Sequence, residues 1–162
     1  MLIIAALLSL ISLYVWLKGI LSMKNHPDMD ENTVVLPRFN AILGIICSLL
    51  FLAPVVYIFH GDDVGMYFCA LVFILFWALG IFLVIGYINY RIEYNNDGFT
   101  HKNSFGKTTS AQYRELTAYR GETRDVKLFV GKDAITVDSF AINSQEFVEL
   151  AKRRYKNQIR RR

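Results

Sequence analysis

The chain has 162 residues, of which 54% are hydrophobic and 14% aromatic, and this is too apolar for an ordinary soluble domain. Its formal net charge of +4 is uneven, because residues 1–90 sum to −2 and residues 91–162 sum to +6. This composition, with only two cysteines, excludes a disordered chain, a disulfide-stapled secreted domain and an ordinary cytosolic enzyme. It predicts a membrane domain over residues 1–90 and a charged domain over residues 91–162.

Three long apolar stretches predict three transmembrane helices. They cover about residues 2–23, 39–59 and 64–88, and each is long enough to cross a hydrocarbon layer of about 30 Å. Only residues 60–63 separate the last two, which we therefore expect to form an antiparallel hairpin, with a bend at Pro54. A cleaved signal peptide is the alternative for the first stretch, but no basic residue precedes it and no A-x-A-like site follows it.

Lys and Arg residues near the span ends predict the orientation, because they favour the cytoplasmic side. Lys18, Lys24 and Arg38 flank the segment between the first two spans, whereas the 60–63 turn contains no basic residue. Arg91 follows the third span. We therefore expect a multi-pass cell-membrane protein with its N-terminus outside and its C-terminal domain cytoplasmic. The expected interfacial anchors are Trp16, Lys18, Arg38 and Arg91.

Small residues inside the spans predict close helix contacts. Gly44 and Ser48 form a small-xxx-small pair, and Gly80 and Gly86 are further candidates. The contacts can lie within one copy or between copies, and both alternatives stay open. Cys47 and Cys69 are expected at different depths, which disfavours a disulfide between them.

From Arg91 onward, hydrophobic and polar residues alternate with the period of two that is typical of strands. Ile92 and Tyr94 begin this pattern, and the run Asn95–Gly98 is a tight-turn signal. In one later strand, Leu116 and Ala118 are expected to face the same way. We expect an antiparallel meander of six or seven short strands, the later ones at about residues 99–102, 107–112, 115–120, 126–130 and 135–137.

One amphipathic helix is predicted to close the meander. Asn143 suits the N-cap and Glu146 can complete a capping box, while Ile142 and Phe147 occupy the positions of a hydrophobic staple. Further along, the helix is expected to dissolve into a basic chain end. The apolar stripe that should pack on the sheet is Phe147, Leu150, Ala151 and Tyr155.

These elements resemble the pleckstrin-homology-like (PH-like) domain of uncharacterised bacterial multi-span membrane proteins. The resemblance covers Tyr90 to about Tyr155. It rests on the runs Ile92-Glu93-Tyr94-Asn95-Asn96-Asp97-Gly98-Phe99, Phe105-Gly106-Lys107, Tyr113-Arg114-Glu115-Leu116 and Glu146-Phe147-Val148-Glu149-Leu150. In that group two or more spans precede a small PH-like barrel, so together with the three predicted spans it implies three transmembrane helices followed by a small α+β domain, whose meander forms a partly closed barrel capped by the C-terminal helix. A plain sheet with one packed helix is the alternative.

The resemblance also implies a mode of binding. PH-like barrels bind partners along an exposed strand edge or at loop ends, and the polar strand at 107–112 is expected to be such an edge. Phosphoinositide binding is not implied, because the turn at Asn95–Gly98 is acidic rather than cationic.

Patterns typical of catalysis or metal binding are absent from the sequence. It contains no nucleophile elbow, P-loop, HExxH or CxxC spacing. The His and acidic residues within 26–31 and 60–63 match no EF-hand or zinc spacing, and we interpret them as solvated loop residues. His101 is interpreted as a surface or edge residue. We therefore expect no enzyme activity, no metal and no cofactor.

The last eleven residues hold seven basic and no acidic side chains, whereas residues 91–149 have a net charge of −1. Such a cluster is a candidate for contact with anionic lipid headgroups, and a solvated helix end is the alternative. No aromatic interleaving supports nucleic-acid binding. The candidate lipid contacts are Lys152, Arg153, Arg154, Lys156, Arg160, Arg161 and Arg162.

The sequence leaves three functions open. The leading hypothesis is a membrane-anchored interaction or scaffold module that binds a protein partner, or further copies of itself, through its cytoplasmic domain. The second is an anionic-lipid sensor that uses the basic C-terminal helix. The third is an accessory subunit of a transporter or membrane enzyme complex. In each case the lipid bilayer is an expected partner.

Overall fold

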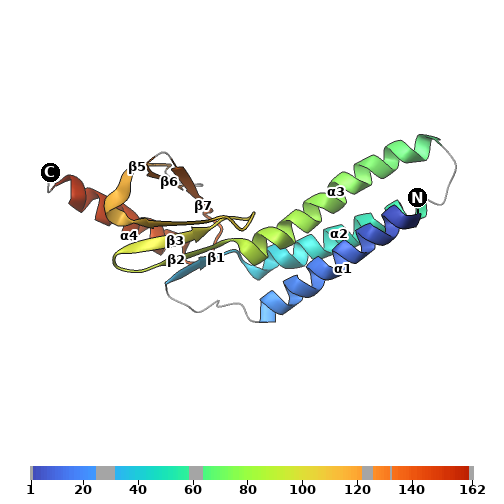
Figure 1. The fold of residues 1–162 in the computed structure, drawn as a ribbon, viewed down its shortest axis with the longest axis horizontal. Helices are drawn as coiled ribbons and strands as arrows, with labels where there is room; N and C mark the ends of the chain where they lie inside the picture. Colours follow the sequence, from blue (N-terminus) through green and yellow to red (C-terminus); the bar gives the residue numbers. More distant parts are fainter. Residues whose placement is uncertain (1, 25–31, 59–63, 122–125, 132, 161–162) are drawn as a thin grey trace. The chain divides into compact units, whose positions relative to one another are not determined.

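In the computed structural model of this chain, the described residues are 2–24, 32–58, 64–121, 126–131 and 133–160. The chain divides into two compact units. The helical unit comprises Met1–His26 and Arg38–Ile88, and the β unit comprises Pro27–Pro37 and Asn89–Arg162 (Figure 1). The β unit is therefore assembled from two separate parts of the sequence.

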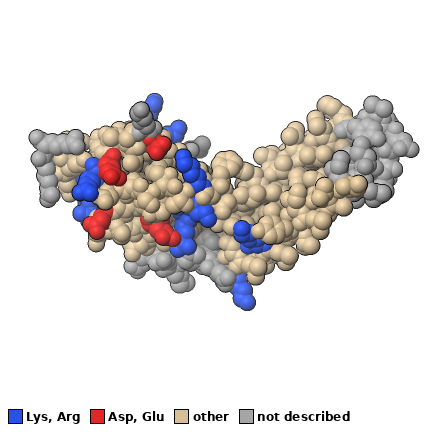
Figure 2. Space-filling model, viewed as in Figure 1, with Lys and Arg blue, Asp and Glu red and all other residues tan. Residues whose placement is uncertain are grey.

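The helical unit contains three long apolar helices, as predicted. Each holds a stretch that is long and apolar enough to cross a membrane, and the described surface of this unit carries few charged side chains (Figure 2). Every helix begins and ends within one residue of the predicted span. The helices are α1 (Leu2–Lys24), α2 (Arg38–Ile58) and α3 (Val64–Asn89).

Helices α2 and α3 approach each other closely at small residues, which confirms the predicted contact. A Cβ atom added to Gly44 would lie 2.6 Å from the carbonyl oxygen of Gly80. A Cβ atom added to Gly80 would lie 2.6 Å from the amide nitrogen of Ser48, well inside the 3.4 Å at which ordinary contacts begin. This contact therefore lies within one copy of the chain.

Two tryptophan–serine hydrogen bonds link the helices. Trp77 Nε1 of α3 donates to Ser12 Oγ of α1 at 2.9 Å, and Trp16 Nε1 of α1 donates to Ser48 Oγ of α2 at 2.7 Å. Both hydroxyls are fully buried and donate in turn to carbonyls of their own helices. Trp16 thus has a packing partner that its proposed role as an interfacial anchor did not indicate.

The described residues of the β unit form two antiparallel sheets, a short 3-10 helix and a C-terminal α-helix, which confirms an α+β domain with a C-terminal helix. The described residues do not close the two sheets into one barrel. One sheet has the order β1-β2-β3-β4, formed by β1 (Thr33–Val35), β2 (Arg91–Tyr94), β3 (Gly98–Lys102) and β4 (Thr108–Gln112). The second sheet has the order β5-β6-β7, formed by β5 (Leu116–Arg120), β6 (Val126–Val130) and β7 (Asp133–Val137). The remaining elements are η1 (Tyr113–Glu115) and α4 (Ser144–Ile159).

Strand β1 comes from the segment between α1 and α2, where the sequence predicts no strand. Thr33 pairs with Glu93 and Val35 with Arg91 in the neighbouring β2. Val35 also exchanges backbone hydrogen bonds with Ile142, 2.8 and 3.4 Å long. Helices α2 and α3 together therefore form the connection between two adjacent strands of one sheet.

Helix α4 packs on the inner face of the four-stranded sheet. The ring centroid of Phe147 lies 5.2 Å from those of Tyr94 and Phe99. Phe147 and Ala151 are fully buried. The predicted apolar stripe is thus buried at Phe147 and Ala151, whereas Leu150 and Tyr155 are half-buried and Val148 is buried in addition.

The predicted N-cap position is confirmed, because Asn143 directly precedes α4, but the predicted capping hydrogen bond is absent. Asn143 has a φ of 61°, and its side-chain Nδ2 donates to the carbonyl of Thr33 at 3.0 Å. The prediction that Leu116 and Ala118 face the same way is wrong. In β5 the pairing register shifts between Leu116 and Ala118. A bulge of this kind interrupts the alternation, so Leu116 is buried while Ala118 is exposed.

Candidate binding surface

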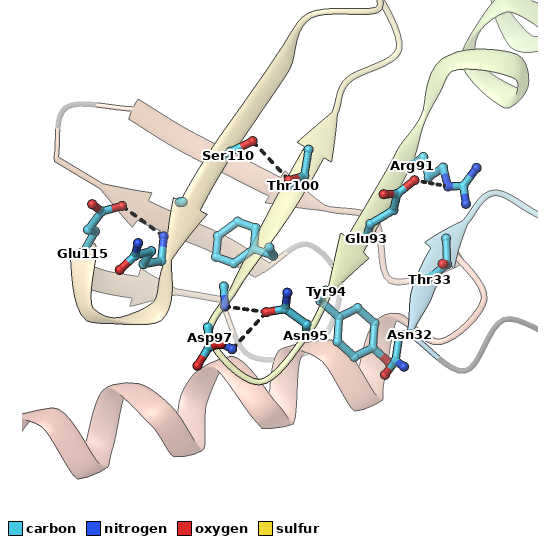
Figure 3. Close-up of a pocket in the computed structure, with 14 residues that line it drawn as sticks. Asn32, Thr33, Arg91, Glu93, Tyr94, Asn95, Asp97, Thr100, Ser110 and Glu115 are labelled. Atoms are coloured by element: carbon cyan, nitrogen blue, oxygen red, sulfur yellow. Dashed lines mark hydrogen bonds and ion pairs between the residues drawn. The ribbon is translucent and has the colours of Figure 1, made fainter.

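The outer face of the four-stranded sheet is polar. Side chains alternate along a strand, so the residues between the buried ones stand on the opposite face. There Glu93, Thr100 and Ser110 form a row across β2, β3 and β4 (Figure 3). The hydroxyls of Thr100 and Ser110 lie 3.0 Å apart, and Arg91 Nε lies 2.9 Å from Glu93 Oε1.

This row lies in an open hollow of about 720 Å³. The hollow extends along the sheet to the β2–β3 turn, where Asn95 Oδ1 accepts hydrogen bonds from the amides of Asp97 and Gly98 (Figure 3). Its described lining holds hydroxyls, amides, carboxylates and one guanidinium, without His, Cys or Lys. These groups suit hydrogen bonding to peptide or other polar groups, and no nucleophile–base pair is among them.

Strand β4 is an edge of this sheet, which confirms the edge predicted at 107–112. The backbone hydrogen bonds at the two ends of the β3–β4 pair, 3.2 and 3.0 Å long, show that odd-numbered residues of β4 bond toward β3. In an antiparallel pair the alternate residues point their backbone groups away. The N–H and C=O groups of Thr108, Ser110 and Gln112 therefore point out of the sheet.

The outward groups of β4 differ in what they contact. The N–H of Gln112 donates to Glu115 Oε2 at 3.0 Å, which terminates the edge. Within the described part of the chain, no residue bonds to the outward backbone groups of Thr108 or Ser110. The strand also lacks the proline and charged residues that commonly protect sheet edges. It is therefore open to pairing with another extended segment.

A second hollow lies where η1 meets α4. Two arginines, Arg114 and Arg154, and two carboxylates, Asp97 and Glu115, line it, so it does not select ligands by charge. Burial raises the pKa of Tyr113 to about 12, with Tyr94 adding to the shift and Arg154 opposing it. The Tyr113 hydroxyl is thus protonated at neutral pH.

The basic chain end is helical rather than dissolved, because α4 continues to Ile159. Two side chains hold its last turns to the domain. Tyr155 Oη donates to the carbonyl of Thr117 at 2.9 Å, and Gln158 Nε2 donates to the carbonyl of Arg114 at 2.7 Å. The predicted fraying is therefore wrong over the described part of this helix.

The seven candidate lipid contacts divide into three groups. Arg154 donates to Asn96 Oδ1 at 3.2 Å, and Lys152 Nζ lies 5.4 Å from the ring centroid of Tyr119, so both contact the domain. Arg161 and Arg162 lie outside the described residues. The remaining candidates, Arg153, Lys156 and Arg160, are exposed.

The other predicted anchors lie at element ends or on exposed helix surface. Arg38 is the first residue of α2 and Arg91 the first of β2. Lys18 is exposed on α1, with its Nζ 5.9 Å from the ring centroid of Tyr14.

The interpretation of His101 as a surface or edge residue is wrong. It lies on β3, an interior strand of the sheet, and only 8% of it is exposed. Its ring stands edge-on to Tyr90 at 5.8 Å, and Nε2 has no hydrogen-bond partner among the described residues. Burial lowers the pKa of His101. The signal in the sequence was its position two residues after Phe99, on the same inward face.

The described residues contain no group of three or more His, Cys, Asp or Glu side chains that could hold a metal ion. The segments 26–31 and 60–63 lie outside the described residues. No protein-family model, no curated protein and no solved structure matches this chain. The likeness to PH-like domains therefore stays a prediction.

Proposed function

We propose that this chain is an integral membrane protein whose β unit binds an extended segment of a protein partner along β4. The outward backbone groups of Thr108 and Ser110, on a strand edge without charge, carry the proposal. In such strand addition, main-chain hydrogen bonds supply affinity and alternate side chains supply selectivity. The PH-like class of the domain and its cytoplasmic location belong to this proposal.

The length of the edge limits its affinity. Two residues with outward N–H and C=O groups offer four hydrogen bonds, worth about 1 kcal/mol each in net terms. Free association costs about 4 kcal/mol or more, so four such bonds cannot hold a soluble peptide tightly. A partner anchored in the same membrane would meet the edge at a higher effective concentration. We therefore infer that the partner is itself a membrane protein, as in the accessory-subunit hypothesis.

The chain path supports the proposed topology. Val35 pairs with Arg91, so the start of α2 and the end of α3 are joined to neighbouring strand ends. Two transmembrane helices connected in this way must cross as a hairpin that begins and ends on one side. The Lys and Arg residues near these ends favour the cytoplasm for that side.

The sensor hypothesis fits the geometry less well. The basic part of α4 is bonded to Asn96, in the turn that follows β2, whereas Arg91 at the other end of β2 continues from α3. Five residues along a strand separate these points, which is about 16 Å. The basic helix end thus contacts the opposite end of β2 from Arg91, the residue that leads back along the chain to α3.

The proposal is tested by placing a photo-crosslinking residue at position 108 in the full-length chain and irradiating native membranes. Ser110→Pro removes an outward N–H but keeps the ladder to β3, and proline is tolerated at such edge positions. Ser110→Ala is the matched control, because it removes the hydroxyl and keeps the backbone donor. We expect one discrete adduct with another membrane protein, retained in Ser110→Ala and lost in Ser110→Pro.

Two results would overturn the proposal. Equal crosslinking in Ser110→Pro and in the parent chain would show that the backbone edge is not the binding determinant. An adduct composed only of two copies of this chain would replace the partner by self-association. Mass spectrometry of the adduct distinguishes these outcomes.

A further inference from the structure

Three large hydrophobic residues are exposed in the described part of the β unit. They are Phe105, Phe140 and Ile159, with 79%, 76% and 56% of their surface exposed. A single exposed hydrophobic residue is ordinary. The two phenylalanines share a further property, because both lie on loops that are hydrogen-bonded to Asn89 or Tyr90, at the end of α3.

The β3–β4 hairpin presents Phe105 in a well-defined turn. Asn103 Oδ1 accepts hydrogen bonds from the amides of Phe105 and Lys107, at 3.0 and 2.9 Å. Gly106 has a φ of 86°, which side-chain-bearing residues rarely adopt. The turn is bonded to the helix end, because Asn89 Nδ2 donates to the carbonyl of Ser104 at 3.1 Å.

The loop between β7 and α4 presents Phe140 in a similar way. Asp138 Oδ1 accepts a hydrogen bond from the amide of Phe140 at 2.8 Å. The amide of Asp138 in turn donates to Tyr90 Oη at 3.0 Å. Further on, Ile142 exchanges backbone hydrogen bonds with Val35, three residues before α2 begins. This loop is therefore hydrogen-bonded to both chain segments that lead into the helical unit, at Val35 and at Tyr90.

We propose that Phe105 and Phe140 insert into the interfacial region of the bilayer in which α3 ends, and so anchor the β unit to the membrane surface. The inference requires that the three apolar helices span a bilayer. Asn89 is the last residue of α3 and Tyr90 follows it. Hydrogen bonds of about 3 Å to these two residues keep both loops within a side chain's length of the point where the span leaves the hydrocarbon.

The chemistry of the hairpin fits a lipid surface. Apolar side chains of interfacial anchors lie about 5–10 Å into the boundary between headgroups and acyl chains. Lys102 and Lys107 flank Phe105 in sequence, and each lysine near an anionic surface contributes about 1 kcal/mol. An aromatic side chain between two lysines matches both layers of that boundary.

The proposal also defines how far the binding edge reaches from the membrane. Strand β4 begins at Thr108, directly after the turn that holds Phe105, and its five residues extend about 17 Å. A segment that pairs with Thr108 and Ser110 would therefore lie within that distance of the surface. This is accessible to a short juxtamembrane stretch of another membrane protein.

The test measures depth directly in the full-length chain, in lipid nanodiscs that contain anionic lipid. Cys47→Ala and Cys69→Ala supply a cysteine-free background, and a nitroxide is attached after Phe105→Cys, Phe140→Cys or Ile159→Cys. Ile159 is the matched control, since it is an exposed hydrophobic residue at the end of α4. A label at Leu50, exposed on α2, is the lipid reference.

Collision with oxygen and with a water-soluble nickel chelate reports whether each label is in lipid or in water. We expect oxygen to dominate at positions 50, 105 and 140 and the chelate to dominate at position 159. The ratio of the two collision rates should be several-fold higher at 105 and 140 than at 159. Aqueous labels at both 105 and 140 would overturn the proposal. A water-exposed label at position 50 would overturn its premise, and the proposal with it.

Discussion

The contact between α2 and α3 predicts that one methyl group will destabilise the helical unit. In Gly80→Ala, the new Cβ atom would lie 2.6 Å from the Ser48 amide nitrogen and 2.8 Å from the Gly44 carbonyl oxygen. Both neighbours are backbone atoms, so no side chain can rotate away. The helices must instead move apart until the contact is normal, a displacement of about 0.8 Å.

This displacement sets the magnitude of the effect. A gap of 0.5–1 Å loses about a quarter to a half of the dispersion energy of each affected contact, and overpacking in well-packed cores costs about 1–3 kcal/mol. Alanine recovers about 0.5–1 kcal/mol because it restricts the unfolded chain more than glycine does. We therefore expect Gly80→Ala to lower the free energy of unfolding by about 1–2 kcal/mol.

Unfolding in mixed micelles, followed by tryptophan fluorescence, measures this change, because Trp16 and Trp77 both lie in helix contacts. Leu79→Ala is the matched control, since Leu79 is the neighbouring residue on the same helix and is 58% exposed. Gly44→Ala combined with Gly80→Ala should cost less than the sum of the single changes, because both open the same contact. An unchanged or increased stability of Gly80→Ala would refute the α2–α3 crossing.

Three further predictions concern the β unit. Phe147→Ala should lower its free energy of unfolding by about 3–5 kcal/mol, measured by protection from proteolysis in denaturant, whereas the exposed Glu149→Ala should change it by less than about 0.5 kcal/mol. Lowering the pH from 7 to 5 should destabilise the β unit, because burial lowers the folded-state pKa of His101. The contribution of His101 to the free energy of unfolding is complete above the unfolded-state pKa of 6.5 and is lost as the pH falls through the folded-state pKa. A pH dependence that persists unchanged in His101→Gln would contradict this. Val34→Asp should make residues 89–162 sensitive to protease, because Val34 is fully buried in β1 and an unpaired buried charge is costly. Asn32→Asp, at an exposed position, is the control. Resistance of Val34→Asp to protease would contradict the pairing of β1.

The elements that the sequence predicted well are those with a local signal. Long apolar runs marked the three helices, because charged residues are rare within them and Lys18 lies near the end of the first. The period of two marked the strands from β2 to β7, because one face of each sheet is buried. The polarity of β4 also identified the edge strand, since an interior strand would need more buried side chains.

The elements that escaped prediction depend on distant partners. Thr33–Val35 is too short to show a period, and its pairing partner lies about 60 residues later in the chain. Asn143 has a good capping sequence, but the carbonyl of Thr33 lies within reach and takes its amide. The exposure of Phe105 and Phe140 is likewise a property of the folded loops, because a hydrophobic residue near a strand end is as often buried as exposed.

The pairing of β1 with β2 has a consequence for the order in which the molecule folds. In a free chain, bringing Val35 to Arg91 would close a loop of about 55 residues, at an entropic cost of roughly 3.5 kcal/mol. Under the proposed topology, insertion of α2 and α3 as a hairpin would bring the two ends of that loop together and remove most of this cost. A fragment that begins at residue 89 lacks both that connection and the strand that pairs with the free side of β2.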